Sequence, residues 1–406
     1  MASSEWKLRR LDELGFLGRG KSRHRPRNDS SLYGGPYPFI QTADIMAADP
    51  YITGYSQTYS ELGFHQSKMW PPETLCMTIA GANTAKTAIL KFNACFPDSI
   101  VGFIPDKSKS DIVFVKYALD LMRDRFLSVS RGATQDNLGL DKILSFPILA
   151  PDIDAQRRIG TILSAYDELI ENSQRRIHII EAIARALYRE WFVYFRFPGY
   201  EKHPLIASSF GLIPKGWEVR KVAEFADFVR GFEPGSNTYT SEPAVDRIKF
   251  LRVGDFSKRD SSIFIPRKLA EGHMLEARDI AITLDGSVGL VRMGLSGAYS
   301  TGIRKLVVRD KARLGWSFLY HLLMSDLIQS TVQAHAKGTT IKHAGTAVAA
   351  FEYVSPPPLL VGKFEQATAP MLNQVQALQE QIQNLRQTRD LLLPRLLSGQ
   401  VDLKEN

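Results

Sequence analysis

The sequence predicts an α+β protein in which two β-rich domains alternate with two long helices. The first observation behind this is a repeat, because Trp6–Gly20 returns as Trp217–Gly231 at an offset of 211 residues. A second is that apolar residues recur at steps of three and four between Pro151 and Pro198, and again beyond Pro358. The remaining chain consists of short β-rich runs separated by Gly, Pro, Asn and Asp. A repeat this long indicates a duplicated domain rather than a solenoid unit.

The predicted domain boundaries follow these changes in composition. The predicted parts are a β-rich domain at 1–150, a helical segment at 151–198, a second β-rich domain at 199–355 and a second helical segment at 356–406. The strands expected within the β-rich domains include Ala88–Leu90, Ile112–Val115, Lys249–Val253 and Lys305–Val308.

The first helical segment carries its apolar stripe through Ile159, Ile162, Tyr166 and Leu169, on a helix of about 40 residues. Neither stripe can stay exposed over such a length, so each helix is expected to pack against the other as a coiled coil. With the two halves related by an internal pseudo-two-fold, that packing is antiparallel. In the second segment, Pro370 is expected to kink the helix or delay its start, and Pro394 to end it.

Composition limits the class of protein. A chain of 406 residues with 44% hydrophobic and 23% charged residues is typical of a globular protein with several domains. The net charge of +8 and the pI near 9.3 favour an acidic partner such as nucleic acid. Two cysteines make a disulfide framework implausible. Since neither a membrane-length apolar run nor a signal-peptide core occurs in the sequence, we expect a cytoplasmic protein.

The run Gly15–Ser22 matches the spacing of a phosphate-binding loop, with Lys21 as its lysine. That mechanism requires a helix immediately after the loop, and the basic, Pro-interrupted residues that follow do not favour one. The second copy has no Lys-Ser pair at this place. We therefore reject nucleotide binding here, although a nucleotide-dependent enzyme that uses Lys21 stays as a weaker alternative.

The same stretch is better suited to binding nucleic acid. Cations at alternate positions of an extended segment project to one side, where they would meet a polyphosphate backbone. The candidate contacts here are Arg19, Lys21, Arg23 and Arg25, with Arg27 continuing the alternation, and those in the second half are Arg230 and Arg252. The alternative is a solvated basic loop.

Two polar segments, Arg131–Asn137 and Lys337–His343, occupy matching places before the two helices. Each opens with a cation and Gly, followed by short polar side chains that can contact base edges or phosphates. The candidate contacts are Arg131, Thr134, Gln135, Lys337, Thr339, Thr340 and Lys342. Ordinary turn chemistry is an equally good explanation of their composition alone.

Catalytic and metal-binding motifs are absent from the sequence. The eight histidines are scattered, and neither an HExxH motif nor a Cys/His pair at metal-ligand spacing occurs. We therefore predict no catalytic residue and no metal ligand in this chain.

Four segments in this order resemble the specificity subunit of type I restriction-modification systems over essentially the full length. They are Gly132–Leu138, Gln156–Ile159, Ile213–Trp217 and Leu385–Gly399. The resemblance implies two target-recognition domains, each reading one half of a split, asymmetric site in double-stranded DNA. It also implies that the helical segments set the spacer between the halves and dock two methyltransferase subunits.

In such systems two motor-nuclease restriction subunits complete the enzyme, and the specificity subunit itself is non-catalytic. The resemblance implies that S-adenosylmethionine, ATP and Mg²⁺ are bound by those partners and not by this chain. One departure is Val361–Gln366, which differs from the Gln-Arg-Arg-Ile of the first copy and allows unequal docking of partners by the two helical segments. The main alternative is a coiled-coil adaptor whose β-rich domains bind proteins.

Overall fold

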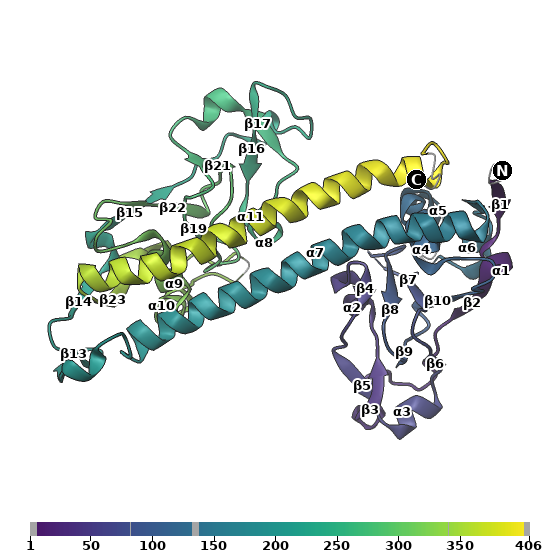
Figure 1. Cartoon of the computed structure of the whole chain (residues 1–406), viewed down its shortest axis with the longest axis horizontal. Coiled ribbons are helices and arrows are strands. Elements are labelled where there is room, and N and C mark those ends of the chain that lie inside the picture. Colours follow the sequence, from purple (N-terminus) through teal and green to yellow (C-terminus); the bar gives the residue numbers. More distant parts are fainter. Residues whose placement is uncertain (1–5, 82, 132–137, 340, 402–406) are drawn as a thin grey trace. The chain divides into compact units, whose positions relative to one another are not determined.

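The computed structural model describes residues 6–81, 83–131, 138–339 and 341–401, and the chain divides into two compact units. Unit 1 comprises residues 1–174 and 380–406, and unit 2 comprises residues 175–379. Two long helices, α7 (Ile153–Tyr188) and α11 (Pro358–Leu397), each contribute one part to each unit (Figure 1). Within the described residues, no helix is long and apolar enough to cross a membrane.

Unit 1 is built on two small sheets. The larger has the strand order β2-β10-β7-β8-β4, the smaller has the order β5-β3-β9-β6, and β1 pairs with β11. The strands are β1 (Lys7–Arg9), β2 (Gly15–Arg19), β3 (Tyr33–Phe39), β4 (Tyr51–Ile52), β5 (Gln57–Tyr59), β6 (Met69–Trp70), β7 (Leu75–Thr78), β8 (Thr87–Leu90), β9 (Ala94–Cys95), β10 (Ile100–Pro105) and β11 (Ile148–Ala150). The helices are α1 (Leu11–Leu14), α2 (Thr42–Ala47), α3 (Glu61–His65), α4 (Ile112–Leu121), α5 (Arg123–Arg131) and α6 (Leu140–Leu144).

Unit 2 contains two four-stranded sheets, β15-β22-β19-β20 and β17-β16-β21-β18, and two strand pairs, β14-β23 and β12-β13. The strands are β12 (Leu205–Ser208), β13 (Gly211–Pro214), β14 (Glu218–Lys221), β15 (Ala226–Arg230), β16 (Arg247–Leu251), β17 (Phe264–Pro266), β18 (Met274–Leu275), β19 (Ala281–Thr283), β20 (Val291–Arg292), β21 (Gly297–Tyr299), β22 (Ile303–Val308) and β23 (Glu352–Ser355). The α-helices besides α7 and α11 are α8 (Val253–Lys258), α9 (Trp316–Met324) and α10 (Asp326–His335).

The two units repeat the same order of elements. β1 pairs with β11 in unit 1 as β14 pairs with β23 in unit 2, and β2 pairs with β10 as β15 pairs with β22. Helices α4 and α5 of unit 1 correspond to α9 and α10, and α2 corresponds to α8. The predicted mixture of β-rich parts and long helices is therefore confirmed, while the pseudo-two-fold stays a prediction.

Helices α7 and α11 run antiparallel, as predicted. In unit 1, Ile159 and Leu163 of α7 share a core with Leu393 and Leu396 near the end of α11. In unit 2, Tyr188 at the end of α7 packs against Phe364 and other side chains near the start of α11. Trp191, Phe192, Phe195 and Phe197, which follow α7, belong to the same core.

The stripe predicted for α7 is displaced by one residue over part of its length. Ile162 and Tyr166 are partly exposed and Leu169 is 48% exposed, whereas Leu163, Asp167 and Ile170 are buried. The apolar pattern predicts the wrong face because the buried face of this helix includes the carboxylate of Asp167.

The strand expected at Ile112–Val115 is wrong, because these residues form the first turn of α4. The Asp111 side chain accepts hydrogen bonds from the backbone N–H groups of Val113 (3.0 Å) and Phe114 (2.9 Å), which caps a helix. A short, fully apolar run does not distinguish a buried strand from a buried helix by its periodicity.

Pro370 does not delay the start of α11 and Pro394 does not end it, since one helix runs from Pro358 to Leu397 through both of them. The kink expected at Pro370 stays a prediction. The residues around Pro370 include the buried Thr368 and Leu372, and those around Pro394 include the buried Leu393 and Leu396. Burial of these side chains on either side outweighs the backbone hydrogen bond that each proline removes.

Candidate nucleic-acid interface

The basic segment of unit 1 begins where strand β2 ends at Arg19. Gly20 lies so close to the backbone that a Cβ there would be 2.4 Å from the carbonyl oxygen of Phe96. The next residue, Lys21, donates its backbone N–H to the same carbonyl at 3.0 Å. The Arg-Gly pair therefore has a structural cause, because only glycine lets the chain pass here while the arginine side chain stays at the strand end.

Two side chains before β6 hold the rest of the segment in place. The Gln66 Oε1 atom accepts hydrogen bonds from the backbone N–H groups of Arg23 and, at 3.0 Å, of His24. The Ser67 hydroxyl donates to the carbonyl of Lys21 at 2.8 Å. The sequence does not predict the roles of Gln66 and Ser67. They are a polar dipeptide more than 40 residues away from the basic segment, and no pattern marks them as its support.

The segment presents fewer free cations than its alternation predicts. Arg25 turns back and donates to the carbonyls of Ser22 (2.9 Å) and His24 (2.8 Å). Arg27 forms an ion pair with Asp98 at 2.7 Å. The side chains of Arg19, Lys21 and Arg23 have neither an ion pair nor a hydrogen bond with the described part of the chain, and only Arg19 lies in a strand. The expected extended row of five parallel side chains is therefore wrong, and three unpaired cations replace it.

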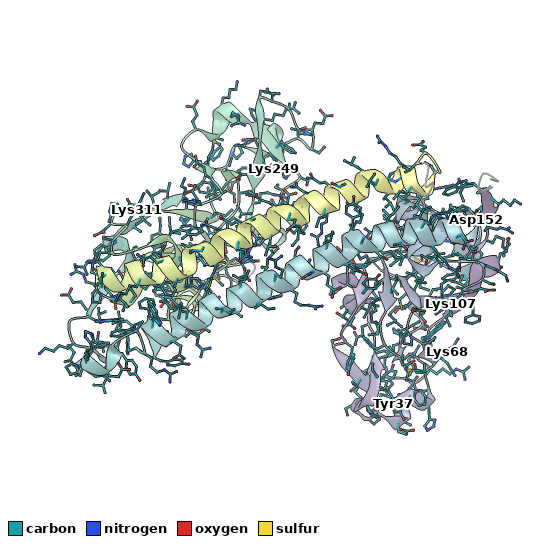
Figure 2. The ribbon with its side chains drawn as sticks, in the orientation of Figure 1. Tyr37, Lys68, Lys107, Asp152, Lys249 and Lys311 are labelled. Atoms are coloured by element: carbon teal, nitrogen blue, oxygen red, sulfur yellow. The ribbon has the colours of Figure 1, made fainter. Side chains whose placement is uncertain are left out.

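A further cation on this unit was not predicted. The Lys68 Nζ atom lies 3.9 Å from the centroid of the Trp70 ring and 4.5 Å from that of Phe16, whose side chain is 52% exposed. Lys68 is exposed on the part of unit 1 that also carries Tyr37 (Figure 2). An exposed aromatic ring beside a cation can contact both a base and a phosphate.

In unit 2, Arg230 ends β15 as Arg19 ends β2, and it is exposed. Its Nε atom donates to the carbonyl of Thr301 at 3.4 Å. Across the sheet it is paired with Arg304, whose pKa is lowered by burial and which also donates to the Thr301 carbonyl. The following Gly231 repeats the geometry of Gly20, since a Cβ there would be 2.3 Å from the carbonyl oxygen of Ser300.

The second polar segment forms a short hairpin. Lys337 and His343 exchange backbone hydrogen bonds of 3.0 and 2.7 Å, and the His343 ring nitrogen Nδ1 is 2.8 Å from a carboxylate oxygen of Asp285. Gly338 has a φ of +113°, which an L side chain rarely adopts. Lys337, Thr339 and Lys342 are exposed on this hairpin.

The structure brings Arg252 to the same surface. It precedes α8, and its Nε atom is 3.3 Å from a carboxylate oxygen of Asp255. The next residue, Val253, fills the space beside Gly302, which also borders Asp285. Because Arg230 contacts Thr301 and the hairpin contacts Asp285, all the described candidates of unit 2 surround the 285–286 and 301–302 turns.

The remaining candidates are placed less completely. Arg131 is the last residue of α5, while Thr134, Gln135 and Thr340 lie outside the described residues. The two polar segments end at matching anchors, because Leu138 donates its N–H to the carbonyl of Ile79 (2.9 Å) and Ala344 to that of Leu284 (2.7 Å).

The described residues hold no group of three or more His, Cys, Asp or Glu side chains arranged to bind a metal ion. Residues 15–19, where the sequence matches a phosphate-binding loop, form strand β2 and pair with β10. These surfaces therefore offer a ligand exposed cations, which lie on the two repeated strand ends and on the loops beside them. Such a set is suited to a polyanion.

Comparison with known proteins shows what the chain is similar to. Residues 3–182 match the family model described as the type I restriction modification DNA specificity domain. The chain is 25% identical over 416 residues to the MjaIX specificity subunit, a type I restriction enzyme component of Methanocaldococcus jannaschii, covering 99% of this chain and 94% of that protein. The similarity to type I restriction enzyme specificity subunits therefore extends over nearly the whole chain, and the match to the family model lies in residues 3–182.

Two further comparisons extend over most of this chain. The HindI type I specificity subunit of Haemophilus influenzae is 20% identical over 344 residues, covering 68% of this chain and 74% of that protein. The crystal structure of the type I restriction-modification S subunit from M. genitalium has the same fold, with a TM-score of 0.59 and 16% identity, covering 100% of this chain and 98% of that chain.

Proposed function

We propose that this protein is the non-catalytic specificity subunit of a type I restriction-modification system and that it reads a bipartite, asymmetric site in double-stranded DNA, one half with each β-rich domain. The observation that carries the proposal is the repetition of elements in the two units, with an arginine at the same strand end and unlike polar loops at the same anchors. Because the two units share a scaffold but differ in their polar loops, we expect the two β-rich domains to read different DNA sequences. The readers are 1–150 and 199–355, and the helical spacers between them are 151–198 and 356–406.

We infer that phosphate contacts provide affinity and register. Arg19, Lys21 and Arg23 in unit 1 and Arg230, Lys337 and Lys342 in unit 2 are exposed or partly exposed cations. Contacts of this kind make affinity fall with salt, with a slope of about −0.9 in log–log form for each phosphate neutralised. Base-edge contacts from the polar loops add specificity of about 1–3 kcal/mol for each base pair read.

We propose that the two long helices dock two methyltransferase subunits, to which restriction motor-nuclease subunits are added. Large apolar side chains on these helices support the proposal, because they are exposed on the chain by itself: Leu169 (48%), Ile179 (54%), Ile183 (50%), Leu359 (74%) and Leu391 (73%). S-adenosylmethionine, ATP and Mg²⁺ would then be bound by those partner subunits.

The start of each helix supports unequal docking. In unit 1 the Gln156 side chain is buried and donates to the carbonyls of Lys109 (3.1 Å) and Pro151 (3.0 Å). In unit 2 the corresponding part of α11 begins with the buried apolar residues Leu360 and Val361. The two helix starts are therefore held to their own units by different contacts.

Mapping of methylated bases in a host that carries the complete system tests this function. We expect a methylated motif of two specified parts that differ from each other and are separated by unspecified bases. A single uninterrupted motif or a palindrome would contradict the proposal. Purified complex should also bind a duplex with this motif with an affinity that falls steeply as salt rises, and salt-independent binding would favour the protein-binding adaptor instead.

A further inference from the structure

The duplication places pairs of residues at the same point of the fold, and one such pair is Arg19 and Arg230. Each is the last residue of the strand that pairs with β10 or β22, and each is followed by a glycine that touches backbone carbonyls. Both arginines are exposed. This cation is therefore the same in both copies, together with the backbone geometry that presents it.

A second pair occupies a neighbouring point but differs in its side chain. Gln41 and Arg252 each precede a six-residue helix, α2 or α8. The backbone N–H of Gln41 donates to the Asp44 carboxylate at 2.7 Å, and that of Arg252 donates to the Asp255 carboxylate at 3.0 Å. The backbone and the supporting aspartate are thus retained, while the side chain itself changes from an amide to a guanidinium.

The two pairs are neighbours in both units. In unit 1, the N–H of Lys21 bonds to the carbonyl of Phe96 (3.0 Å), and that of Ile40 to the adjacent carbonyl of Cys95 (2.8 Å). In unit 2, the N–H of Phe232 bonds to the carbonyl of Tyr299 (3.2 Å), and that of Ser300 to the carbonyl of Leu251 (3.0 Å). In each unit, the chain after the repeated arginine and the chain before the variable residue meet at one strand end.

The variable residues have side chains of the kinds that read bases, and the Gln41 amide is oriented by the hydrogen bond that its Nε2 atom donates to the Oε1 atom of Gln57. The Arg252 Nε atom is 3.3 Å from the carboxylate of Asp255, which is itself 7% exposed, so the guanidinium is held at its base. Its two terminal nitrogens have no hydrogen-bond partner among the described residues. Arginine pairs in a bidentate manner with the O6 and N7 atoms of guanine, and glutamine with the N6 and N7 atoms of adenine.

Any two half-sites of DNA have the same phosphodiester backbone but different base edges. Phosphates carry no sequence information and recur in both halves, whereas the base edges in the major groove differ. We infer that Arg19 and Arg230 contact the phosphodiester backbone of their respective half-sites, and that Gln41 and Arg252 each read a base in theirs. This assignment rests on the proposed function and states which repeated position supplies affinity and which supplies specificity.

The test uses the full chain with its methyltransferase subunits and the duplex motif found by methylation mapping. A panel of duplexes replaces each base pair of the second half-site in turn. We expect Arg230→Ala to weaken binding to every duplex by the same factor and to reduce the magnitude of the salt slope by about 0.9. We expect Arg252→Gln to reduce discrimination at a single G·C pair by roughly tenfold and to leave the other positions unchanged.

Two further variants control for charge and folding. Arg304 lies near the start of β22, and the exposed cation Lys311 follows the end of the same strand (Figure 2). We expect Lys311→Ala to change neither the salt slope nor the base preference. Arg252→Lys keeps the charge without the planar fork, and we expect it to lose the preference for guanine as Arg252→Gln does. Unfolding curves like that of the unmodified protein exclude misfolding.

The results of these binding experiments distinguish a failure of this inference from a failure of the proposed function. If the unmodified complex shows no salt-dependent binding to the mapped motif, the proposed function fails. If the unmodified complex binds, the inference is overturned when Arg230→Ala changes the base preference. It is overturned equally when Arg252→Gln and Arg252→Lys leave discrimination unchanged at each position of the half-site.

Discussion

The carboxylate of Glu365 on α11 accepts a 2.7 Å hydrogen bond from the backbone N–H of Phe318 in the first turn of α9. It also accepts the N–H of Ser317 at 3.1 Å, so one helix of unit 2 caps another. Unit 1 achieves the same cap by the reverse arrangement. There Asp111 caps α4 directly, and Gly160 of α7 lies where a Cβ would be 2.3 Å from the Asp111 carboxylate. The acid and the glycine have exchanged places between the two copies.

The exchange predicts the behaviour of variants in unit 2. Glu365→Ala should destabilise the protein by about 1–2 kcal/mol, because two N–H groups of α9 lose their acceptor. Gly315→Asp by itself should also destabilise, since a Cβ there would be 2.5 Å from the Glu365 side chain. Urea unfolding of both variants checks these values. The combination Gly315→Asp with Glu365→Gly recreates the arrangement of unit 1, so it should be more stable than Glu365→Gly alone, and equal stabilities would contradict the assignment of the cap.

A buried ion pair distinguishes the helix packing of unit 1 from that of unit 2. Arg389 of α11 bonds to Asp167 of α7 at 2.8 Å, and the Tyr117 hydroxyl donates to the same carboxylate at 2.6 Å. The side chains of Arg389 and Asp167 are 10% and 1% exposed, and burial raises the pKa of the Asp167 carboxyl group. At the offset of 205 residues between the two helices, unit 2 carries Leu372 in place of Asp167 and Ala184 in place of Arg389.

We therefore expect the ion pair to be strongly coupled. Asp167→Leu and Arg389→Ala should each cost about 3–5 kcal/mol, because each leaves one buried charge without its partner. The double variant should be more stable than either single variant, since it has the side chains that unit 2 already uses. A double-mutant cycle by urea unfolding measures the coupling, and additive losses would show that the pair contributes no specific interaction.

His321 predicts how stability depends on pH. Its ring is buried among Tyr188, Tyr320 and Phe364, and burial lowers its pKa from 6.5 to about 4. Other groups face the ring as well: Ser317, whose carbonyl bonds to Nδ1, and Arg185, whose charge lowers the pKa further. The folded state keeps His321 neutral, so between pH 6.5 and 4 the unfolded state binds more protons.

Stability should therefore fall as pH decreases through that window, by about 3 kcal/mol from this group. His321→Gln cannot take up the proton, so its free energy of unfolding should fall less between pH 7 and pH 4 than that of the unmodified protein. Unfolding measured at both pH values provides the comparison. Parallel losses in the two proteins would mean that other groups account for the pH dependence.

The first basic segment predicts an effect on one half-site only. Replacing Arg19, Lys21 and Arg23 together by Ala removes three cations without breaking an ion pair in the described chain, so affinity should fall when the first half-site is intact. Gln66→Leu keeps these cations but releases the backbone of Arg23 and His24, and it should weaken the same half-site by roughly tenfold. Duplexes with one or the other half scrambled provide the measurement. Equal loss at both halves, or none, would rule out this placement.

Much of this fold can be read from the chain. The repeat of Trp6–Gly20 at Trp217–Gly231 indicates two similar domains, and the periodicity of three and four residues indicates α7 and α11. These patterns are visible because a duplicated scaffold retains its buried residues and its close backbone approaches, such as those at Gly20 and Gly231. The candidate cations at Arg19 and Arg230 follow from the same alignment.

Other features were decided by tertiary structure. The sequence does not show that Arg25 turns onto its own backbone, that Arg27 pairs with Asp98, or that Gln66 supports Arg23. Each of these depends on a partner brought near by folding, and charge counting treats all cations alike. The segment Ile112–Val115 became a helix for a related reason, since the cap from Asp111 and the burial of Val113, Phe114 and Val115 outweigh β propensity.

The duplication itself, the two long helices and the basic character of the chain were thus determined by sequence alone, because they rest on residue identity and spacing. The tertiary structure decided which of the repeated positions lie beside one another. It placed Gln41 and Arg252 beside the repeated arginines, and it paired Asp167 with Arg389 where the other copy has only apolar side chains. The physical reason is that a side chain's role depends on its neighbours in space, which a one-dimensional pattern does not contain.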